Sequence, residues 1–274
     1  MVDGAEIRVL PVGDIQYAGL NGATDLERLR SHIGWGVSHN CYFVGMGDYV
    51  DFASPSNRAR LQGALLYDSA QEVIDQAATS LEQQLFAVLA PSKGRWLGLV
   101  QGHHFFPHLD GTTTDTRLAQ FLGCPFLGDC GVVILRFPHE GKTAIIDCKI
   151  WVHHGAGSGF TAASVLSALE RKVIGFEADV YLMGHRHERL SRRLPRLYPI
   201  WHKGRARLIQ RIRILACTGG WMEGYMLGHE FESRAQGIYV EKRMLNPVAL
   251  GGPCLYIRPR IKSGYVNLDL DILT

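Results

Sequence analysis

The sequence predicts an α/β protein built as one domain. Nearly half of the 274 residues are hydrophobic, which is enough to bury a large core. Short apolar runs alternate with amphipathic stretches, the pattern typical of alternating strands and helices. Neither an internal repeat nor a low-complexity linker interrupts the chain, so we expect one continuous domain over residues 1–274.

Strands are predicted where short apolar runs end in glycine or a polar cluster. In chain order these runs cover residues 6–13, 41–47, 95–101, 131–137, 143–153, 179–183 and 212–217.

Helices are predicted between these strands. One opens at Thr24, with Glu27 three residues later as a capping box. A long helix opens at Ser69 and is stopped by Pro91, and a third runs from Thr161.

The charge of the chain is unevenly distributed. Residues 186–213 hold ten Lys or Arg and one acid, so this stretch carries +9 while the rest of the chain sums to −6. Such a strip suits a phosphate-bearing partner, but a solvated β-hairpin with basic faces explains it as well.

Ligand-type side chains follow five of the predicted strands. Carboxyl ends of strands gather functional groups in open α/β sheets, so these side chains are expected to converge on one site. Imidazole and carboxylate groups bind divalent transition metals, although each residue alone has a plain structural explanation such as capping or burial. They are Asp14 and Gln16 in GDIQ, Asp48 in GDYVD, His103 and His104 in GHH, His153 and His154 in HHG, and His185 and His187 in GHRH.

The ordered blocks D-x-Q, G-D-x-x-D, G-H-H, H-H-G and G-H-x-H resemble those of calcineurin-like metallophosphoesterases, whose usual form is D-x-H, G-D-x-x-D, G-N-H, H and G-H-x-H. They span Asp14 to His187, about two-thirds of the chain. The resemblance implies a four-layer α-β-β-α sandwich of two mixed sheets flanked by helices. In it, the final part of the chain, including the carboxyl-terminal segment, fits the second sheet.

The resemblance also implies two divalent metal ions and a metal-bound hydroxide that attacks phosphorus. Asp14, Gln16 and His187 would hold one ion, and Asp48 would bridge the two. The other ion would be held by His103, His185 and one of His153 or His154.

His153 and His154 point to opposite faces of a strand, so one of them is expected to be the ligand. We favour His153.

Two further residues take roles from the same resemblance. His104 falls where the family keeps a histidine beside the leaving group, so it is the candidate proton donor, and Asp48 is placed in the catalytic centre with it. Asp51 completes the second block as a partner of a ligand or as a structural residue.

Two ligands depart from the usual pattern. Gln16 replaces a His with a harder amide oxygen, which favours Mn over Zn, with Mg, Fe and Ni as further options. GDIQYA is similar to the first block of manganese-dependent ADP-ribose/CDP-alcohol diphosphatases. His103 replaces an Asn, and both replacements are competent ligands.

The sequence predicts a phosphodiesterase or phosphatase without naming its substrate. Arg189, Arg192 and Arg193 follow GHRH directly and are candidates for binding a phosphate-ester substrate, such as a nucleic acid or nucleotide. The alternative is a nucleic-acid-binding module with a structural or vestigial metal site. Without a leader or a long apolar run, we expect a cytoplasmic protein with no membrane contact. The oligomeric state stays open.

Overall fold

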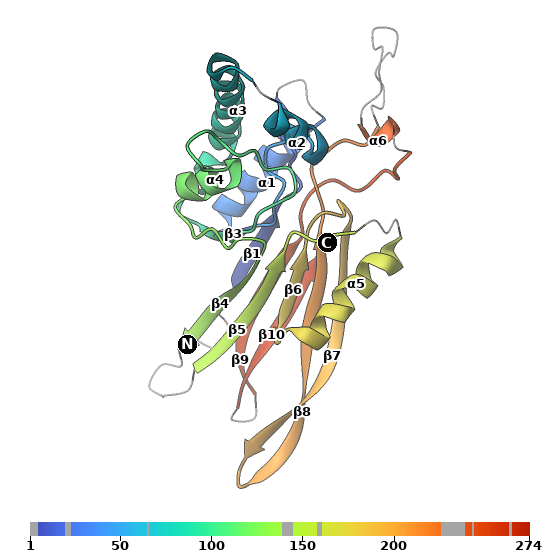
Figure 1. Ribbon diagram of the computed structural model, residues 1–274. Helices are drawn as coiled ribbons and strands as arrows, with labels where there is room; N and C mark the ends of the chain where they lie inside the picture. The colour runs from blue at the N-terminus through green and yellow to red at the C-terminus, as the bar shows by residue number, and fades with distance from the viewer. Residues whose placement is uncertain are drawn as a thin grey trace.

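Two five-stranded mixed sheets pack face to face, with helices on both outer sides (Figure 1). This arrangement confirms the predicted α-β-β-α sandwich. The computed structural model describes residues 5–19, 23–64, 66–138, 145–157, 161–225, 239–242, 244–262 and 265–274.

The first sheet has the order β10-β9-β1-β2-β3. Its parallel part consists of β1 (Ile7–Val12), β2 (Tyr42–Gly45) and β3 (Trp96–Leu99). β9 (Cys254–Lys262) runs antiparallel to β1 and to β10 (Tyr265–Leu273). The carboxyl-terminal segment therefore extends the first sheet beside β1, and its expected place in the second sheet is wrong.

The second sheet has the order β4-β5-β6-β8-β7. β5 (Ile145–His153), β6 (Val180–Met183) and β8 (Arg205–Thr218) are parallel. The edge strands β4 (Cys130–Pro138) and β7 (Arg189–His202) are antiparallel to their neighbours. All seven predicted strands are present in the described residues, apart from residues 143 and 144, which lie outside them.

Helices cover the outer face of each sheet. None of the helices described is long and apolar enough to cross a membrane. The helices that cover the first sheet were predicted only in part, since α2 (Pro55–Gly63) and α4 (Thr114–Leu122) were not expected. The helices are α1 (Leu26–Ser38), α2 (Pro55–Gly63), α3 (Asp68–Leu89), a 3₁₀ turn (Ala90–Ser92), α4 (Thr114–Leu122), α5 (Ala162–Gly175) and α6 (Tyr239–Lys242).

The predicted cap of α1 is wrong by one residue. Asp25 is the N-cap, and its side chain accepts a hydrogen bond from the Arg28 amide at 2.9 Å. Thr24 instead donates from Oγ1 to the carbonyl oxygens of Ile15 and Gln16, at 3.0 and 3.1 Å. The hydroxyl thus fixes the loop after β1 rather than the helix end.

Of the other two predicted helix starts, the one at Thr161 holds: Thr161 caps α5 and forms a capping box with Ser164. The start at Ser69 is late, since α3 begins at Asp68 with Tyr67 as its N-cap. The 3₁₀ turn that contains Pro91 follows its last residue, as expected.

Alternation along the strands divides the core into layers. Val9 packs between the two sheets, whereas its neighbour Leu10 packs under α1 and α3. Trp151 and Leu215 of the second sheet pack against α5. Burying one such Leu or Val side chain contributes roughly 1.5–3 kcal/mol, so the three apolar layers fix how the sheets sit on each other.

β7 and β8 form a long two-stranded ribbon. Their pairing runs from Arg189 opposite Thr218 to His202 opposite Arg205. Within β8, only residues 214–217 pair with β6. The far half of the ribbon therefore projects beyond the other strands (Figure 1). Lys203 and Gly204 both have positive φ, at 50° and 75°, as a two-residue type I′ turn requires.

Candidate metal centre

The predicted ligands lie just beyond the carboxyl ends of parallel strands in both sheets. Asp14 follows β1, Asp48 follows β2, and His185 follows β6. Within the first sheet, the Asp14 amide donates to the Gly47 carbonyl at 2.9 Å, and across the sheets the His185 amide donates to the Asp14 carboxylate at 2.9 Å. The convergence expected from strand order is thus realised between the sheets.

Four side chains form a cluster that can hold a metal ion. One potential ligand atom from each of Asp48, His103, His154 and His185 lies within 4.8 Å of the other three. Nε2 of His154 is 3.1 Å from Oδ2 of Asp48, and the Nδ1 atoms of His103 and His185 are 3.3 Å apart. Ligands that share one ion at about 2.1 Å stand roughly 3.0–3.4 Å apart, so both distances suit a common ion.

A second, smaller group lies beside the first. Nε2 of His187 is 3.7 Å from Oδ1 of the fully buried Asp14. Gln16 is also buried, and its backbone amide donates to the backbone carbonyl of Asp48 at 2.9 Å. Asp14 and His187 therefore lie together beside the four-residue cluster, and the backbone of Gln16 adjoins that of Asp48.

The electrostatics of the site suit bound cations. Burial raises the pKa of Asp14 to about 7, and the nearby Asp48 carboxylate adds to that rise. Burial also lowers the pKa of His185 and of His187, each to about 4, which leaves lone pairs available. Nε2 of His154 is buried against the Asp48 carboxylate. Buried carboxylates and neutral imidazoles are the features of a metal-binding donor set.

The charges on Asp48 and His154 depend on each other. Burial opposes ionisation of Asp48, but the adjacent His154 ring and the His104 amide outweigh it, so the pKa of Asp48 is lowered. Burial likewise disfavours protonated His154, yet the Asp48 and Asp14 carboxylates raise the pKa of His154 to about 9. A divalent cation would take over the role of this buried proton.

Five site residues have a left-handed backbone. Non-glycine residues rarely adopt positive φ, which costs of order 1–3 kcal/mol each and is concentrated at functional sites. The residues are Asp14 (φ 50°), Gln16 (49°), Asp48 (54°), His185 (69°) and His187 (53°).

Glycines next to the ligands allow neighbouring loops of the first sheet, and the two sheets themselves, to approach closely. A Cβ on Gly102 would lie 2.0 Å from the Asp48 nitrogen and 2.1 Å from its Oδ1. A Cβ on Gly47 would lie 2.6 Å from Nδ1 of His154, and Gly47 also has a positive φ of 90°. The glycines before the ligands in the GDYVD and GHH blocks are thus required by space.

His104 lies at the rim of the cluster and contacts Asp51. Its Nδ1 is 2.9 Å from Oδ1 of Asp51, and its Nε2 is 4.0 Å from Oδ2 of Asp48. Burial lowers the pKa of His104, but the Asp51 and Asp48 carboxylates outweigh burial and raise the pKa overall. The ring is therefore held by one carboxylate while its other nitrogen faces the cluster.

The structure places His154, and not the favoured His153, in the cluster. Nδ1 of His154 contacts the Met46 carbonyl across the inter-sheet layer at 2.7 Å. His153 points to the outer face, where its ring stacks on Trp151 and its Nδ1 accepts from the Gly155 amide at 2.7 Å. The two rings do alternate as expected, but the face toward the first sheet belongs to His154.

Two of the three predicted substrate arginines are engaged with carboxylates of the protein itself. Arg192 pairs with Glu170 on α5, and Arg193 pairs with Asp271 on β10. Both lie farther along β7, which runs away from the site. Arg189, two residues after His187, is the one of the three that stays at the site's end of the strand.

Two residues that hold the GHH loop were missed. The fully buried Asp115 accepts from the Gly102 amide at 3.0 Å, and burial raises the pKa of Asp115 to about 7. Arg58 of α2 donates to the His103 carbonyl at 2.9 Å and to that of Phe105. Thr113, which caps α4, is a sequence signal for the helix that carries Asp115; nothing local points to Arg58.

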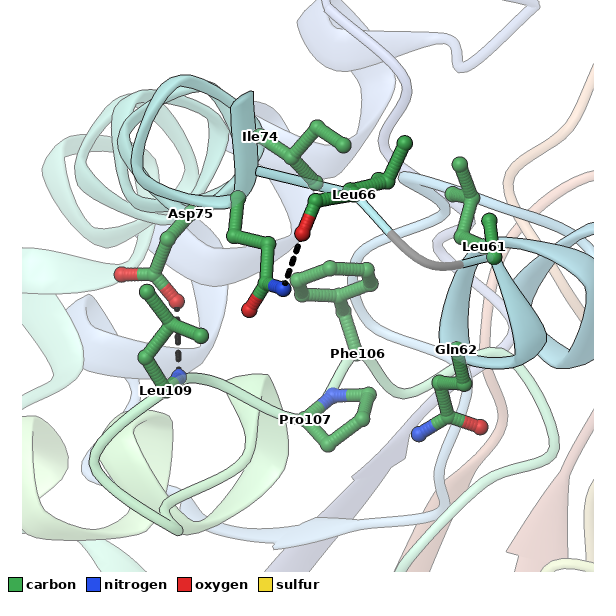
Figure 2. Close-up of a pocket in the computed structure, with 10 residues that line it drawn as sticks. Leu61, Gln62, Leu66, Ile74, Asp75, Phe106, Pro107 and Leu109 are labelled. Atoms are coloured by element: carbon green, nitrogen blue, oxygen red, sulfur yellow. Dashed lines mark hydrogen bonds between the residues drawn. The ribbon is translucent and has the colours of Figure 1, made fainter. Parts of the chain in front are cut away.

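A pocket of about 140 Å³ lies beside the segment that follows this loop (Figure 2). The end of α2, the start of α3 and the residues Phe106, Pro107 and Leu109 line it. Asp75 accepts from the Leu109 amide at 3.0 Å at its edge. None of the predicted ligands lines this pocket, so it is separate from the metal-binding cluster.

Comparison with known proteins found similarity only among solved structures. No family model and no curated protein matches the chain. Vacuolar protein sorting 29 from Cryptosporidium parvum is 12% identical over 98% of each chain, with a TM-score of 0.35. The Zn-bound vacuolar protein sorting 29 of Entamoeba histolytica is 10% identical over 97% of this chain and 99% of that chain, with a TM-score of 0.37.

A metallophosphoesterase from Sphaerobacter thermophilus is 10% identical over 97% of this chain and 88% of that chain, with a TM-score of 0.32. Such low identities and TM-scores say nothing of activity. The function of the site has to be judged from its own residues.

Proposed function

We propose that this chain is a metal-dependent hydrolase of phosphate esters with a two-ion centre. The observation that carries the proposal is the cluster of Asp48, His103, His154 and His185, whose potential ligand atoms lie within 4.8 Å of one another. The matching order of the sequence blocks supports the same assignment.

The ligands divide between two positions. His103, His154 and His185 would hold one ion, and Asp14, Gln16 and His187 would hold the other. Asp48 lies between the two sets: its Oδ2 faces His154, and its charge raises the pKa of Asp14. When bound, divalent ions neutralise phosphoryl oxygens and acidify water, which makes hydrolysis possible without a covalent enzyme intermediate.

Mn²⁺ is the ion that this donor set favours in our proposal. Gln16 contributes a neutral amide oxygen, a harder donor than imidazole, to the side of Asp14. Three imidazoles on the other side also suit Zn²⁺, Fe or Ni²⁺, so the two positions need not hold the same metal.

The protein's own part in the reaction is to position groups and move a proton. His104 has one ring nitrogen on Asp51 and the other toward the cluster, which suits a proton donor to the leaving oxygen. Its raised pKa keeps the ring protonated to higher pH. Arg58 and Asp115 hold the loop that carries both histidines.

Hydrolysis by metal-stripped protein tests the proposal. Mn²⁺, Mg²⁺, Zn²⁺ or Ni²⁺ is restored in turn, and the substrates are bis(p-nitrophenyl) phosphate, p-nitrophenyl phosphate, ADP-ribose and single-stranded DNA. We expect turnover that depends on added metal and is lost in Asp48→Asn.

Asp129→Asn is the matched control, because Asp129 is exposed and lies outside the cluster. Turnover that survives Asp48→Asn would contradict the proposal. Bound metal without turnover on any substrate would favour a binding module with a structural metal.

A further inference from the structure

The projecting half of the β7–β8 ribbon has two chemically different faces. Residues opposite each other in an antiparallel pair share a face. One face, the cationic face, carries the pairs Arg196–Arg211, Tyr198–Ile209, Ile200–Arg207 and His202–Arg205. The other face carries Leu197–Gln210, Pro199–Leu208 and Trp201–Ala206, and has no charge.

The outer arginines of the cationic face are free to bind a partner. Arg196, Arg205 and Arg207 are exposed and make no ion pair or hydrogen bond with any residue that the structure describes. No acid occurs between residues 189 and 213. The arginines nearer the body are engaged: Arg213 pairs with Glu177, and Arg211 lies 4.2 Å from the Tyr198 ring centre.

We infer that the cationic face binds the phosphate backbone of a nucleic acid whose scissile phosphodiester lies at the metal centre. This inference rests on the proposed function and extends it to a polymeric substrate. Arg196 shares a hollow with Asp147, Glu177 and Asp179 of the body, whereas Arg205 and Arg207 lie beyond that hollow. These exposed arginines, on a strand pair that itself carries no acid, provide the positive charge that a polyphosphate chain requires. A two-stranded ribbon is also an element that fits the major groove of a duplex.

The ribbon sets a length for the substrate. At about 3.4 Å per residue, Arg196 lies about 24 Å along β7 from Arg189, and the level of Arg207 lies about 37 Å along it. At about 3.4 Å per base pair these distances correspond to roughly 7–11 base pairs. Arg189 itself lies on the opposite face of β7, so a substrate that joins the two places has to pass around this edge strand. Shorter substrates would reach the metal centre without touching the cationic face.

A lipid surface fits the ribbon less well. Leu197, Trp201 and Leu208 are more than half exposed and lie on the uncharged face. If that face entered a bilayer, the arginines of the opposite face would point away from the anionic headgroups. The separation of charge and apolar surface therefore favours nucleic acid on the cationic face.

Binding by the metal-free full chain is measured first, so that no cleavage occurs. Fluorescence anisotropy follows labelled 30-nucleotide single-stranded DNA, the matching duplex and single-stranded RNA over a range of salt. We expect the triple variant Arg196→Gln/Arg205→Gln/Arg207→Gln to bind at least about tenfold more weakly. Its salt slope should fall by up to about 2.7, since each phosphate contact contributes about 0.9.

The matched control removes three cations from the side of the first sheet, as Arg30→Gln/Lys93→Gln/Arg95→Gln. It should bind the preferred nucleic acid as the wild type does. If both variants bind nucleic acid equally weakly, the loss of affinity reflects net charge alone, and the inference is overturned. So would an unchanged affinity in the ribbon variant, or binding to phosphatidylglycerol vesicles with none to any nucleic acid.

Activity separates the inference from the proposed function. The ribbon variant should hydrolyse bis(p-nitrophenyl) phosphate like the wild type and lose kcat/KM only on substrates longer than about ten base pairs. If the wild type does not hydrolyse the small diester, the proposed function is wrong. The anisotropy measurement still decides separately whether the cationic face binds nucleic acid. Equal loss on short and long substrates would contradict the ribbon's role.

Discussion

Nδ1 of His104 lies 2.9 Å from Oδ1 of Asp51, so a carboxylate orients the ring whose other nitrogen faces the cluster. An oriented, protonated imidazole at this place can give its proton to a leaving oxygen. This proton donation speeds the reaction only when the leaving group needs a proton to depart.

Asp51→Asn is therefore expected to act selectively. Hydrolysis of an alkyl ester should slow by about 10- to 100-fold, a loss typical of a missing acid catalyst. The reason is that the His104 ring loses the carboxylate that orients it and favours its protonated form. Hydrolysis of a nitrophenyl ester, whose leaving group departs without a proton, should change little. Steady-state kcat values for the two esters check this, and equal losses on both would rule out the proton-donor role.

His154→Ala and His153→Ala should separate the two neighbouring rings. His154 belongs to the cluster, so its loss should abolish binding of one ion equivalent. His153 faces away, so its alanine variant should keep the wild-type stoichiometry. Metal content after dialysis, measured by mass spectrometry, decides the matter; the reverse pattern would restore the preference for His153.

Gly102→Ala should disrupt the centre. Its Cβ would collide with backbone and carboxylate atoms of Asp48, which are not flexible, so we expect a loss of more than about 3 kcal/mol in the free energy of unfolding or a misfolded site. Gly34→Ala in α1 meets nothing within 4 Å and should gain up to about 1 kcal/mol from helix propensity. Urea denaturation compares them, and a neutral Gly102→Ala would show that the loop can move.

His108 should make stability depend on pH. Burial lowers the pKa of His108, but its contacts to Glu82 at 2.8 Å and Asp75 at 2.9 Å outweigh burial and raise the pKa above 6.5. Its protonation therefore stabilises the folded state fully below pH 6.5, and the contribution is lost as pH rises through the folded-state pKa.

As the pH rises above 6.5, the free energy of unfolding of the wild type should thus fall more steeply than that of Glu82→Gln. Urea titrations at several pH values measure both slopes. Parallel slopes would mean that the Glu82 contact does not set the charge on His108.

The sequence predicted seven of the ten described strands, β1 to β6 and the end of β8, because their signal is local. Residues 43–47, for example, are buried on both faces, and a short apolar run can be recognised without knowing its neighbours. The convergence of Asp14, Asp48 and His185 followed equally from strand polarity. Helices α2 and α4 were missed, and α2 buries none of its residues, so no apolar stripe marks it.

The predictions about the site that were wrong concern side chains whose place depends on residues far away in the sequence. Alternation separates His153 from His154, but which face is inward depends on how the second sheet docks on the first. The partners of Arg192 and Arg193 lie 22 and 78 residues away, so local charge could not reveal them. A β-hairpin was one reading of the basic stretch, but only the observed register shows which side chains share a face of the ribbon.

The contact between the His185 amide and the Asp14 carboxylate joins residues 171 positions apart. Closing so long a loop is slow, and it can happen only after the sheets that carry the two residues have met. Metal affinity should therefore appear late in refolding, after most secondary structure has formed. A chain emerging from the ribosome would remain unable to assemble its centre until His187 had left the exit tunnel.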